Sequence, residues 1–267
     1  MTKSFIRTYL LLSIFQFAFA AVDKTNADQI LDHSQTVRRI PNTRADAILK
    51  TKSDRFNDEK EFTFMRKLAE DGERFKTLTR FKKPLTIKNQ AILFMEKENY
   101  ENSIFMYLPA YKKVRRVESH SQSSSFMGSA FSYSDIATPL SKDFTNTLVK
   151  SEDCPSDKSK KCFVINSKPK TKQIKERTNY SLQTSWINTE NFLVDQTLLF
   201  AEDTSKFVKK ITFSDYKNVR TNLWFCQSMV IEDTKSKKTT TLLFSNLKAD
   251  QELSNSIFSQ QSLSDEK

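Results

Sequence analysis

The sequence is poor in the residues on which most catalytic and cofactor-binding motifs depend. Glycine occurs at only two of the 267 positions, Gly72 and Gly128. A dinucleotide or phosphate loop needs clustered glycines, so the sequence excludes that class of site. Histidine is equally scarce, and neither His33 nor His120 has a second histidine or a cysteine at metal-ligand spacing. A catalytic zinc site is therefore not expected, and the sequence predicts no metal and no cofactor.

Cysteine is also rare, with three residues in the chain. Cys154 and Cys162 flank the polar segment 155–161 and could close it as a disulfide in an oxidising compartment. Three free thiols are the alternative. Cys226 lies in an apolar run, where we expect it to pack as a small core residue.

The first twenty residues have the pattern of a cleaved secretory signal. A basic start with Lys3 and Arg7 precedes an apolar stretch, and residues 18–20 (Ala-Phe-Ala) supply the small-x-small cleavage pattern. A membrane anchor is the alternative, but the apolar run is shorter than the roughly 20 residues that a spanning helix needs. We therefore expect residues 1–20 to be a signal peptide and the mature chain to begin in the periplasm at Ala21.

The remaining residues, 21–267, have a plausible size for one all-β domain, and neither a linker nor a repeat of fixed period divides them. The full sequence carries a net charge of +11. A basic protein outside the cytoplasm suggests contact with anionic lipid headgroups or acidic partners, although dispersed lysines also fit an ordinary solvated surface. No nucleic-acid motif is present, so nucleic acid is not an expected partner.

Short β-type runs follow one another along most of the chain. One helix is predicted before them, over residues 26–39, with Asn26 or Thr25 as its cap. Strands are predicted at 45–52, 61–70, 74–81, 90–97, 103–108, 114–119, 144–150, 161–167, 180–188, 192–202, 207–216, 222–232 and 239–247. A loop is expected at 167–178 and a short helix at 253–263. Closely spaced strands without alternating helices favour an antiparallel sheet.

Phenylalanine is abundant, with 22 residues. Most of these side chains are expected to fill a core. A subset could instead line an apolar cavity too wide to be filled, as in barrels that hold a ligand. The sequence does not divide the two sets.

A dense block runs from Met106 to Asp135. Pro109 is expected to end a strand, because proline cannot donate to a strand ladder. The following Arg115-Arg116 pair has two interpretations. The pair could hold a carboxylate or phosphate through paired hydrogen bonds, or it could form an internal ion pair with Asp135 or Glu118.

The second half of this block is aromatic. Gly128 is expected to have a backbone reason, such as a positive φ, while Phe126, Met127 and Phe131 provide an adaptable apolar surface. Ser129 has no histidine base nearby in the sequence, and the Gly-x-Ser-x-Gly elbow of hydrolases is absent. A hydrolase is therefore the least favoured class.

These residues resemble the signature of the outer-membrane lipoprotein-sorting proteins, relatives of the LolA and LolB carriers. The matching positions are Tyr107, Leu108, Pro109, Ala110, Arg115, Arg116, Phe126, Met127, Gly128, Ser129, Phe131, Ser132, Tyr133 and Asp135. The chain departs from the pattern at Ala130, where aspartate is usual, and at Ser134, where glutamate is usual. Weaker matches lie at 80–84, 91–93 and 186–188.

The resemblance implies a mainly β (α+β) fold, in which a strongly curved antiparallel sheet forms an unclosed half barrel with helices covering its concave face. It implies a monomeric, non-enzymatic periplasmic carrier. Such a carrier shields the acyl chains of a lipid or lipoprotein during transport to the outer membrane, exchanging them with an inner-membrane transporter or an outer-membrane acceptor. The alternative is an envelope sensor or adaptor on the same fold that regulates or assists a membrane transporter. The ligand-binding positions that the resemblance implies are Tyr107, Arg115, Arg116, Phe126, Met127, Gly128, Phe131, Tyr133 and Asp135.

Overall fold

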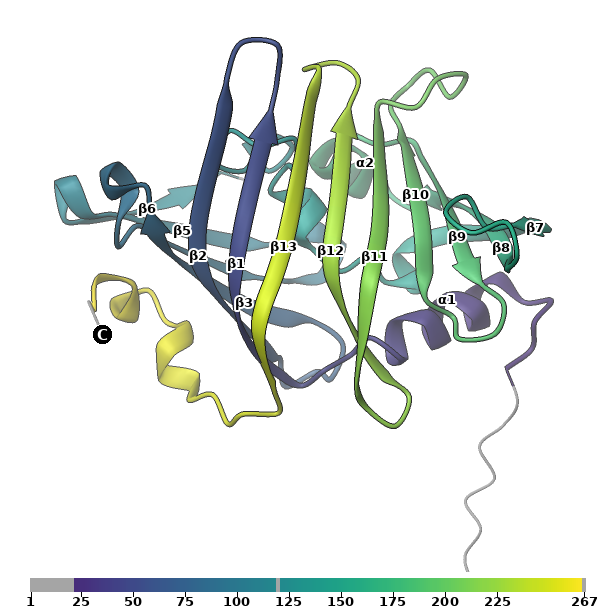
Figure 1. Cartoon of the computed structure of the whole chain (residues 1–267), viewed down its shortest axis with the longest axis horizontal. Helices are drawn as coiled ribbons and strands as arrows, with labels where there is room; N and C mark the ends of the chain where they lie inside the picture. Colours follow the sequence, from purple (N-terminus) through teal and green to yellow (C-terminus); the bar gives the residue numbers. More distant parts are fainter. Residues whose placement is uncertain (1–21, 119–120, 266–267) are drawn as a thin grey trace, which may run out of the picture.

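The computed structural model describes residues 22–118 and 121–265. The predicted signal peptide, residues 1–20, lies outside these ranges, as does His120. Within them, thirteen strands form one antiparallel sheet, accompanied by two α-helices and several short 3-10 turns (Figure 1). None of the helices described is long and apolar enough to cross a membrane.

The helices are α1 (Ala27–Thr36) and α2 (Lys172–Thr178). The strands are β1 (Asn42–Lys52), β2 (Asn57–Leu68), β3 (Phe75–Lys83), β4 (Ala91–Met95), β5 (Ser103–Leu108), β6 (Lys113–Val117), β7 (Phe144–Asp153), β8 (Lys161–Pro169), β9 (Leu182–Asn188), β10 (Val194–Phe200), β11 (Lys209–Arg220), β12 (Leu223–Asp233) and β13 (Lys238–Ala249).

The strand order is β6-β5-β4-β3-β2-β1-β13-β12-β11-β10-β9-β8-β7. The first six strands run by hairpins from the middle of the sheet to one edge, and the last seven return from the opposite edge. The strands nearest the two chain ends, β1 and β13, therefore pair in the middle, with Thr51 opposite Thr240. The chain passes from edge to edge once, through the segment between Val117 and Phe144, which we call the crossover segment.

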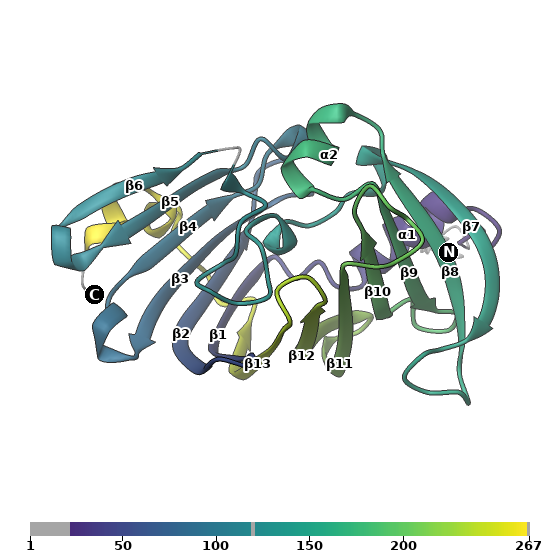
Figure 2. The same cartoon turned by 90° about the horizontal axis from the view of Figure 1, so that it is seen from above.

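The sheet is bent into an arch (Figure 2), and its edge strands β6 and β7 do not pair with each other. The predicted unclosed antiparallel sheet is therefore confirmed. α2 and the crossover segment lie on the hollow side of the arch (Figure 2). Strand alternation sends successive side chains to opposite faces, so each strand supplies both the hollow and the outer side.

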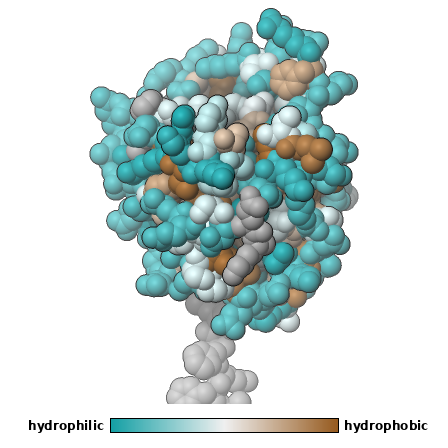
Figure 3. Space-filling model, turned by 90° about the vertical axis from the view of Figure 1, so that its left-hand side faces the viewer, coloured by the Kyte–Doolittle hydropathy of each residue, from teal (hydrophilic) through white to brown (hydrophobic). Residues whose placement is uncertain are grey.

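Both faces of the sheet bury apolar side chains. The largest cluster joins the hollow face to the crossover segment and includes Leu49, Phe62, Phe126 and Phe131. On the outer face, the C-terminal 3-10 turns pack Phe258 and Leu263 against strands β3 to β5. The molecule's side near β6 and these turns is mostly hydrophilic, with small separate apolar spots (Figure 3).

Local sequence explains where α1 begins. The Asn26 side chain accepts hydrogen bonds from the backbone N–H groups of Asp28 and Gln29, which confirms the predicted cap. Ile30 and Ser34 are buried against the rest of the molecule. The helix ends at Thr36, slightly earlier than predicted.

The loop predicted at 167–178 is wrong. β8 continues to Pro169 and α2 follows, capped by Thr171, whose hydroxyl accepts from the N–H of Ile174. Ile174 is the one apolar side chain that this seven-residue helix buries, so the sequence shows no helical periodicity. The short helix predicted at 253–263 is formed as two 3-10 turns, Asn255–Phe258 and Gln261–Ser264.

Cys154 and Cys162 are joined by a disulfide across the β7–β8 hairpin, with an S–S distance of 1.98 Å. Cys226 is free and lies on β12.

Candidate ligand-binding cavity

A cavity of about 350 Å³ lies on the hollow side of the sheet. Nine phenylalanine side chains contribute to its wall, so the structure separates them from those that only fill a core. These are Phe62, Phe64, Phe75, Phe126, Phe131, Phe144, Phe213, Phe225 and Phe244. A concave, mainly apolar space with a few polar groups is the usual form of a small-molecule site in a protein.

The strands supply the cavity floor through alternation. On β3 the side chains of Phe75, Thr77 and Thr79 face the cavity, while the intervening Leu78 packs on the outer face. On β13 Leu242 and Phe244 face it, whereas Leu243 between them is exposed. A single strand thus delivers a lining residue at every second position.

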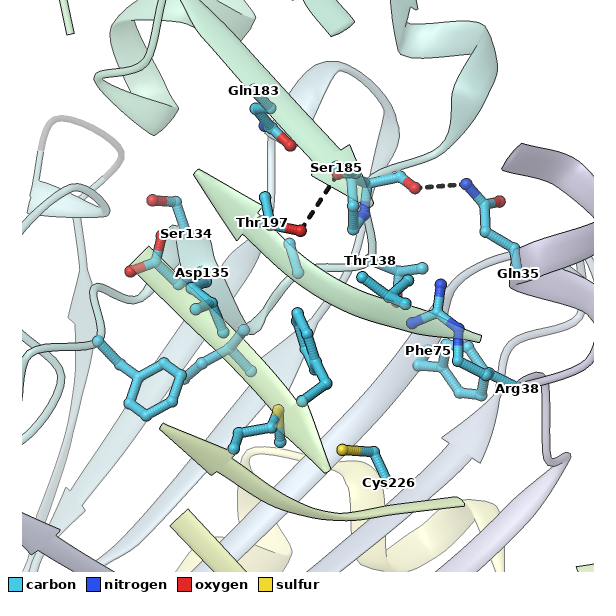
Figure 4. A pocket seen from close by; sticks show the side chains of 18 of the residues that line it. Gln35, Arg38, Phe75, Ser134, Asp135, Thr138, Gln183, Ser185, Thr197 and Cys226 are labelled. Atoms are coloured by element: carbon cyan, nitrogen blue, oxygen red, sulfur yellow. Dashed lines mark hydrogen bonds between the residues drawn. The ribbon is translucent and has the colours of Figure 1, made fainter. Parts of the chain in front are cut away.

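α1 and the crossover segment form the opposite wall (Figure 4). Leu31 and Ser34 of α1 line the cavity together with Ala137 and Leu140 of the crossover segment. The Gln35 side chain donates to the carbonyl of Pro139 at 2.6 Å and so ties this helix to the segment. The hydroxyl of Ser141 adds a second tie by donating to Asp32.

The predicted aromatic motif forms a tight turn inside this wall. The Phe126 N–H donates to the carbonyl of Phe131 at 2.7 Å, and the rings of Phe126 and Tyr133 meet edge to face at 5.5 Å. Between them, Met127 has φ +51° and Gly128 has φ +81°. The positive φ predicted for Gly128 is thereby confirmed, and it explains the glycine at this position, because this conformation favours glycine.

Hydrogen bonds also fix the motif. The Ser129 hydroxyl donates to the carbonyl of Phe126 at 2.6 Å, which gives this serine a structural partner. The Ala130 N–H donates to the hydroxyl of Thr240 at 2.9 Å, and that hydroxyl lies 3.0 Å from the hydroxyl of Thr51. The motif is thus attached to the two central strands of the sheet. The hydrogen bond to Thr240 uses the backbone of Ala130, so it does not require the aspartate that is usual at this position.

Asp135 lies at the edge of the cavity in a buried cluster. Its carboxylate accepts from Lys209 Nζ at 2.7 Å, from the hydroxyl of Tyr180 at 2.8 Å and from the Ser132 N–H at 2.7 Å. Its side chain is 1% exposed. Burial, together with the charge of Asp135, raises the pKa of Tyr180 well above its usual range, so this phenol remains a hydrogen-bond donor.

The structure brings only part of the predicted set to the cavity. Phe126, Phe131 and Asp135 line it. Met127, Gly128 and Tyr133 shape the turn that holds these residues.

The other predicted positions lie elsewhere. Tyr107 packs on the outer face of the sheet, because it alternates with Met106, which packs toward the hollow side. Arg115 and Arg116 are exposed on edge strand β6, where Arg115 lies 5.9 Å from the ring centre of Tyr111. The interpretation as an internal ion pair with Asp135 or Glu118 is wrong: neither arginine forms an ion pair within residues 22–118 and 121–265, and Asp135 pairs with Lys209.

Sequence analysis missed a polar end of the cavity. Arg66 lies 3.4 Å from Glu96, donates to the hydroxyl of Thr138 at 2.5 Å and stacks 3.7 Å from the ring centre of Phe75. Glu96 also accepts from the Thr138 N–H at 3.2 Å. The sequence contained a pattern that could have placed Arg66 in the cavity. Arg66 continues the alternation by which Phe62 and Phe64 of β2 face the hollow side of the sheet.

The arrangement is suited to binding an apolar ligand. No set of three histidine, cysteine or acidic residues in the described part of the chain could hold a metal ion. Burial raises the pKa of Cys226, the thiol in the cavity wall, to about 11, so it is protonated at neutral pH. A partly polar, mainly apolar space can hold an acyl chain and position one polar group.

Comparison with solved structures shows that this architecture is shared by proteins of low sequence identity. An outer membrane lipoprotein-sorting protein domain from Vibrio parahaemolyticus superposes with a TM-score of 0.81 at 21% identity, covering 89% of this chain and 98% of that one. A DUF1329 family protein from Desulfovibrio piger gives 0.80 at 22% identity, with 89% and 97% covered. A LolA superfamily protein from Nitrosomonas europaea gives 0.68 at 19% identity, with 88% and 98% covered. The resemblance predicted from the sequence is confirmed at the level of the fold.

A family model described as "Uncharacterized protein" matches residues 73–265, which is more than half of the chain, and the protein belongs to that family. No curated protein sequence matches the chain.

Proposed function

We propose that the protein is a periplasmic carrier that takes up acyl chains of a lipid or lipoprotein in its cavity and performs no catalysis. The cavity of about 350 Å³ on the hollow side of the sheet carries this proposal. Its phenylalanine lining offers an acyl chain an apolar environment comparable to a membrane interior. The likeness in fold to a lipoprotein-sorting domain supports the same function.

The energetics are compatible with extraction from a membrane. Each methylene removed from water contributes roughly 0.8 kcal/mol, so only a carrier that buries most of the chain can compete with a bilayer. We propose that α1, α2 and the crossover segment cover the concave face and move to admit and release the chain. The Gln35–Pro139 and Asp32–Ser141 hydrogen bonds are the contacts that would open.

The proposed location is the periplasm, with residues 1–20 as a cleaved signal peptide and 21–267 as one monomeric domain. The Cys154–Cys162 disulfide is compatible with an oxidising compartment. Removal of Lys3 and Arg7 with the signal peptide lowers the net charge from +11 to +9, and this positive charge favours approach to anionic membrane surfaces. An inner-membrane transporter and an outer-membrane acceptor are the proposed donor and recipient of the cargo.

The test is native mass spectrometry, with lipid extraction, on protein purified from the periplasm without detergent. A bound phospholipid or acylated peptide mass is expected. A protein mass without lipid, unchanged after incubation with envelope lipids, would contradict the carrier and favour the sensor or adaptor.

A matched pair of variants tests whether the cavity is the binding site. Leu242 faces the cavity, while its neighbour Leu243 is exposed on the other face. Leu242→Trp fills the space and is expected to reduce bound lipid at least tenfold, whereas Leu243→Trp should leave it unchanged. Equal lipid in both variants would place the cargo elsewhere.

A further inference from the structure

One end of the cavity carries two arginines that have no carboxylate partner among the residues that the structure describes. Arg66 has Glu96 as its partner, and Lys209 has Asp135. Arg38 and Arg39, which follow α1 and also line the cavity, form no ion pair within the described residues.

Arg38 retains unused donors. Its Nε–H donates to the carbonyl of Ser34 at 2.9 Å, and one Nη2 hydrogen reaches the Ser34 hydroxyl at 3.4 Å. A guanidinium group has five N–H donors in a planar fork, so most of the fork remains available. Figure 4 shows the side chain extending from the end of the helix toward Thr138 and the cavity.

The polar groups around Arg38 are already engaged with one another. The Gln35 amide is bonded to Pro139, and the Thr138 hydroxyl and N–H are bonded to Glu96 and Arg66. Among the described residues that line the cavity, Asp135 is the one carboxylate, and it is already paired with Lys209. A partly buried cation beside an apolar cavity is costly unless an anion pairs with it, so a bound anion would remove this cost.

The charge of Arg38 also acts on the cavity floor. It favours the ionised form of Cys226, opposing the burial that raises the pKa of this thiol. Adding to the effect of burial, the same positive charge lowers the pKa of Arg66 by repulsion between the two guanidinium groups. An anion near Arg38 would therefore lie in a field that is positive across this end of the cavity.

The cavity is large enough for the apolar part of a lipid. A methylene group is about as large as a water molecule, whose share of liquid volume is ~30 Å³. A volume of about 350 Å³ therefore accommodates an acyl chain of at least about a dozen methylenes.

We infer that the cargo is an amphiphile with an anionic head group, whose carboxylate or phosphate is held by Arg38 and Arg39 while an acyl chain fills the cavity. This inference rests on the proposed carrier function and specifies its cargo. Guanidinium forks suit both head groups, because each offers two oxygens to paired N–H donors.

The test compares ligands that share a twelve-carbon chain. Binding of laurate, dodecyl phosphate and 1-dodecanol is followed through the fluorescence of Trp224, which lines the cavity, in a Trp186→Phe background. At least one anionic ligand is expected to bind about tenfold or more tightly than the alcohol. Fatty acids shorter than laurate should lose affinity about fourfold per methylene. Acetate and inorganic phosphate, which have no chain, should not compete.

Variants locate the anion. Arg38→Gln with Arg39→Gln should bring the anion-to-alcohol affinity ratio close to one, and Arg38→Lys should retain part of it. Arg55, an exposed arginine in the β1–β2 turn, provides the control Arg55→Gln, which should keep the ratio. Because the ratio compares two ligands on one protein, it is insensitive to a loss of stability when α1 loses its Ser34 contacts.

The outcomes separate the two proposals. Equal binding of the anions and the alcohol, or an unchanged ratio in the double variant, would overturn the head-group inference and leave the carrier intact. Competition by acetate or inorganic phosphate would overturn it as well. Failure of all three long-chain ligands to bind would overturn both proposals.

Discussion

Lys209 Nζ lies 2.7 Å from Asp135 Oδ2 in the interior of the protein, and this ion pair joins β11 to the crossover segment. The lysine side chain is 11% exposed and the aspartate side chain 1%. The pair therefore fixes one end of the cavity wall to the sheet, and it suggests a direct test.

Lys209→Met should lower the free energy of unfolding by about 3–5 kcal/mol, because it leaves a buried carboxylate without its cation. The adjacent Lys210 pairs with Glu232 at 2.6 Å near the surface, so Lys210→Met should cost no more than about 1 kcal/mol. Urea unfolding of both variants measures the difference. Similar losses would show that the Asp135 contact has no special role.

Asp46 should contribute to acid sensitivity. Hydrogen bonds from Asn246 and then Lys82 hold the pKa of this carboxyl below its ordinary value of 3.8. A depressed folded-state pKa gives stability that is present above pH ~3.8 and is lost as pH falls through the lower value. Asp46→Asn should therefore show a smaller loss of unfolding free energy on acidification below pH ~4 than the wild type. Asn246→Ala, which removes the main donor, should show the same flattening, and an unchanged acid slope in both variants would refute this origin.

Cys226 should react slowly with iodoacetamide at neutral pH. Burial raises the pKa of its thiol to about 11, so about one molecule in a thousand carries the thiolate at pH ~8. The alkylation rate, measured by intact mass, should rise about tenfold per pH unit toward that value. A bound acyl chain should slow it further, since the residue lines the cavity. Labelling as fast as in urea-unfolded protein would contradict the burial.

The Cys154–Cys162 disulfide should stabilise the fold without affecting binding. It closes a short loop, with a sequence separation of 8, at the outer hairpin β7–β8. Replacing both cysteines by serine should cost about 2–3 kcal/mol of unfolding free energy, mainly through a less constrained unfolded chain. Acyl-chain affinity should stay within twofold of the wild type. A large loss of affinity would instead link this hairpin to the cavity.

Much of the sheet could be predicted from the sequence. Strand-length runs bounded by turn residues predicted thirteen strands, and thirteen are formed in the described residues. Predicted and observed ends differ by a few residues, as with 61–70 and β2 (Asn57–Leu68), because the polar ends of long hairpins carry no apolar alternation. α2 escaped prediction because only Ile174 and Thr178 are buried in it.

The cavity could be predicted only in part. The motif positions Phe126, Phe131 and Asp135 reach it, but its polar end depends on contacts between distant segments. Arg66 meets Glu96 through strand pairing across β3, and Arg38 becomes a cavity residue only when α1 docks on the crossover segment. No local sequence pattern predicts such contacts between distant segments. The resemblance identified motif positions such as Tyr107 without indicating which face of the sheet each one occupies.

The pairing of β1 with β13 also determines how the polypeptide can reach this structure. Thr51 and Thr240, which face each other in the middle of the sheet, are separated by 189 residues. Either half-sheet can form by local hairpins, but each then exposes a long unpaired edge until the final strand is available. Such edges promote intermolecular strand pairing, so biogenesis of this protein should depend on keeping both halves apart from other chains until β13 has been added.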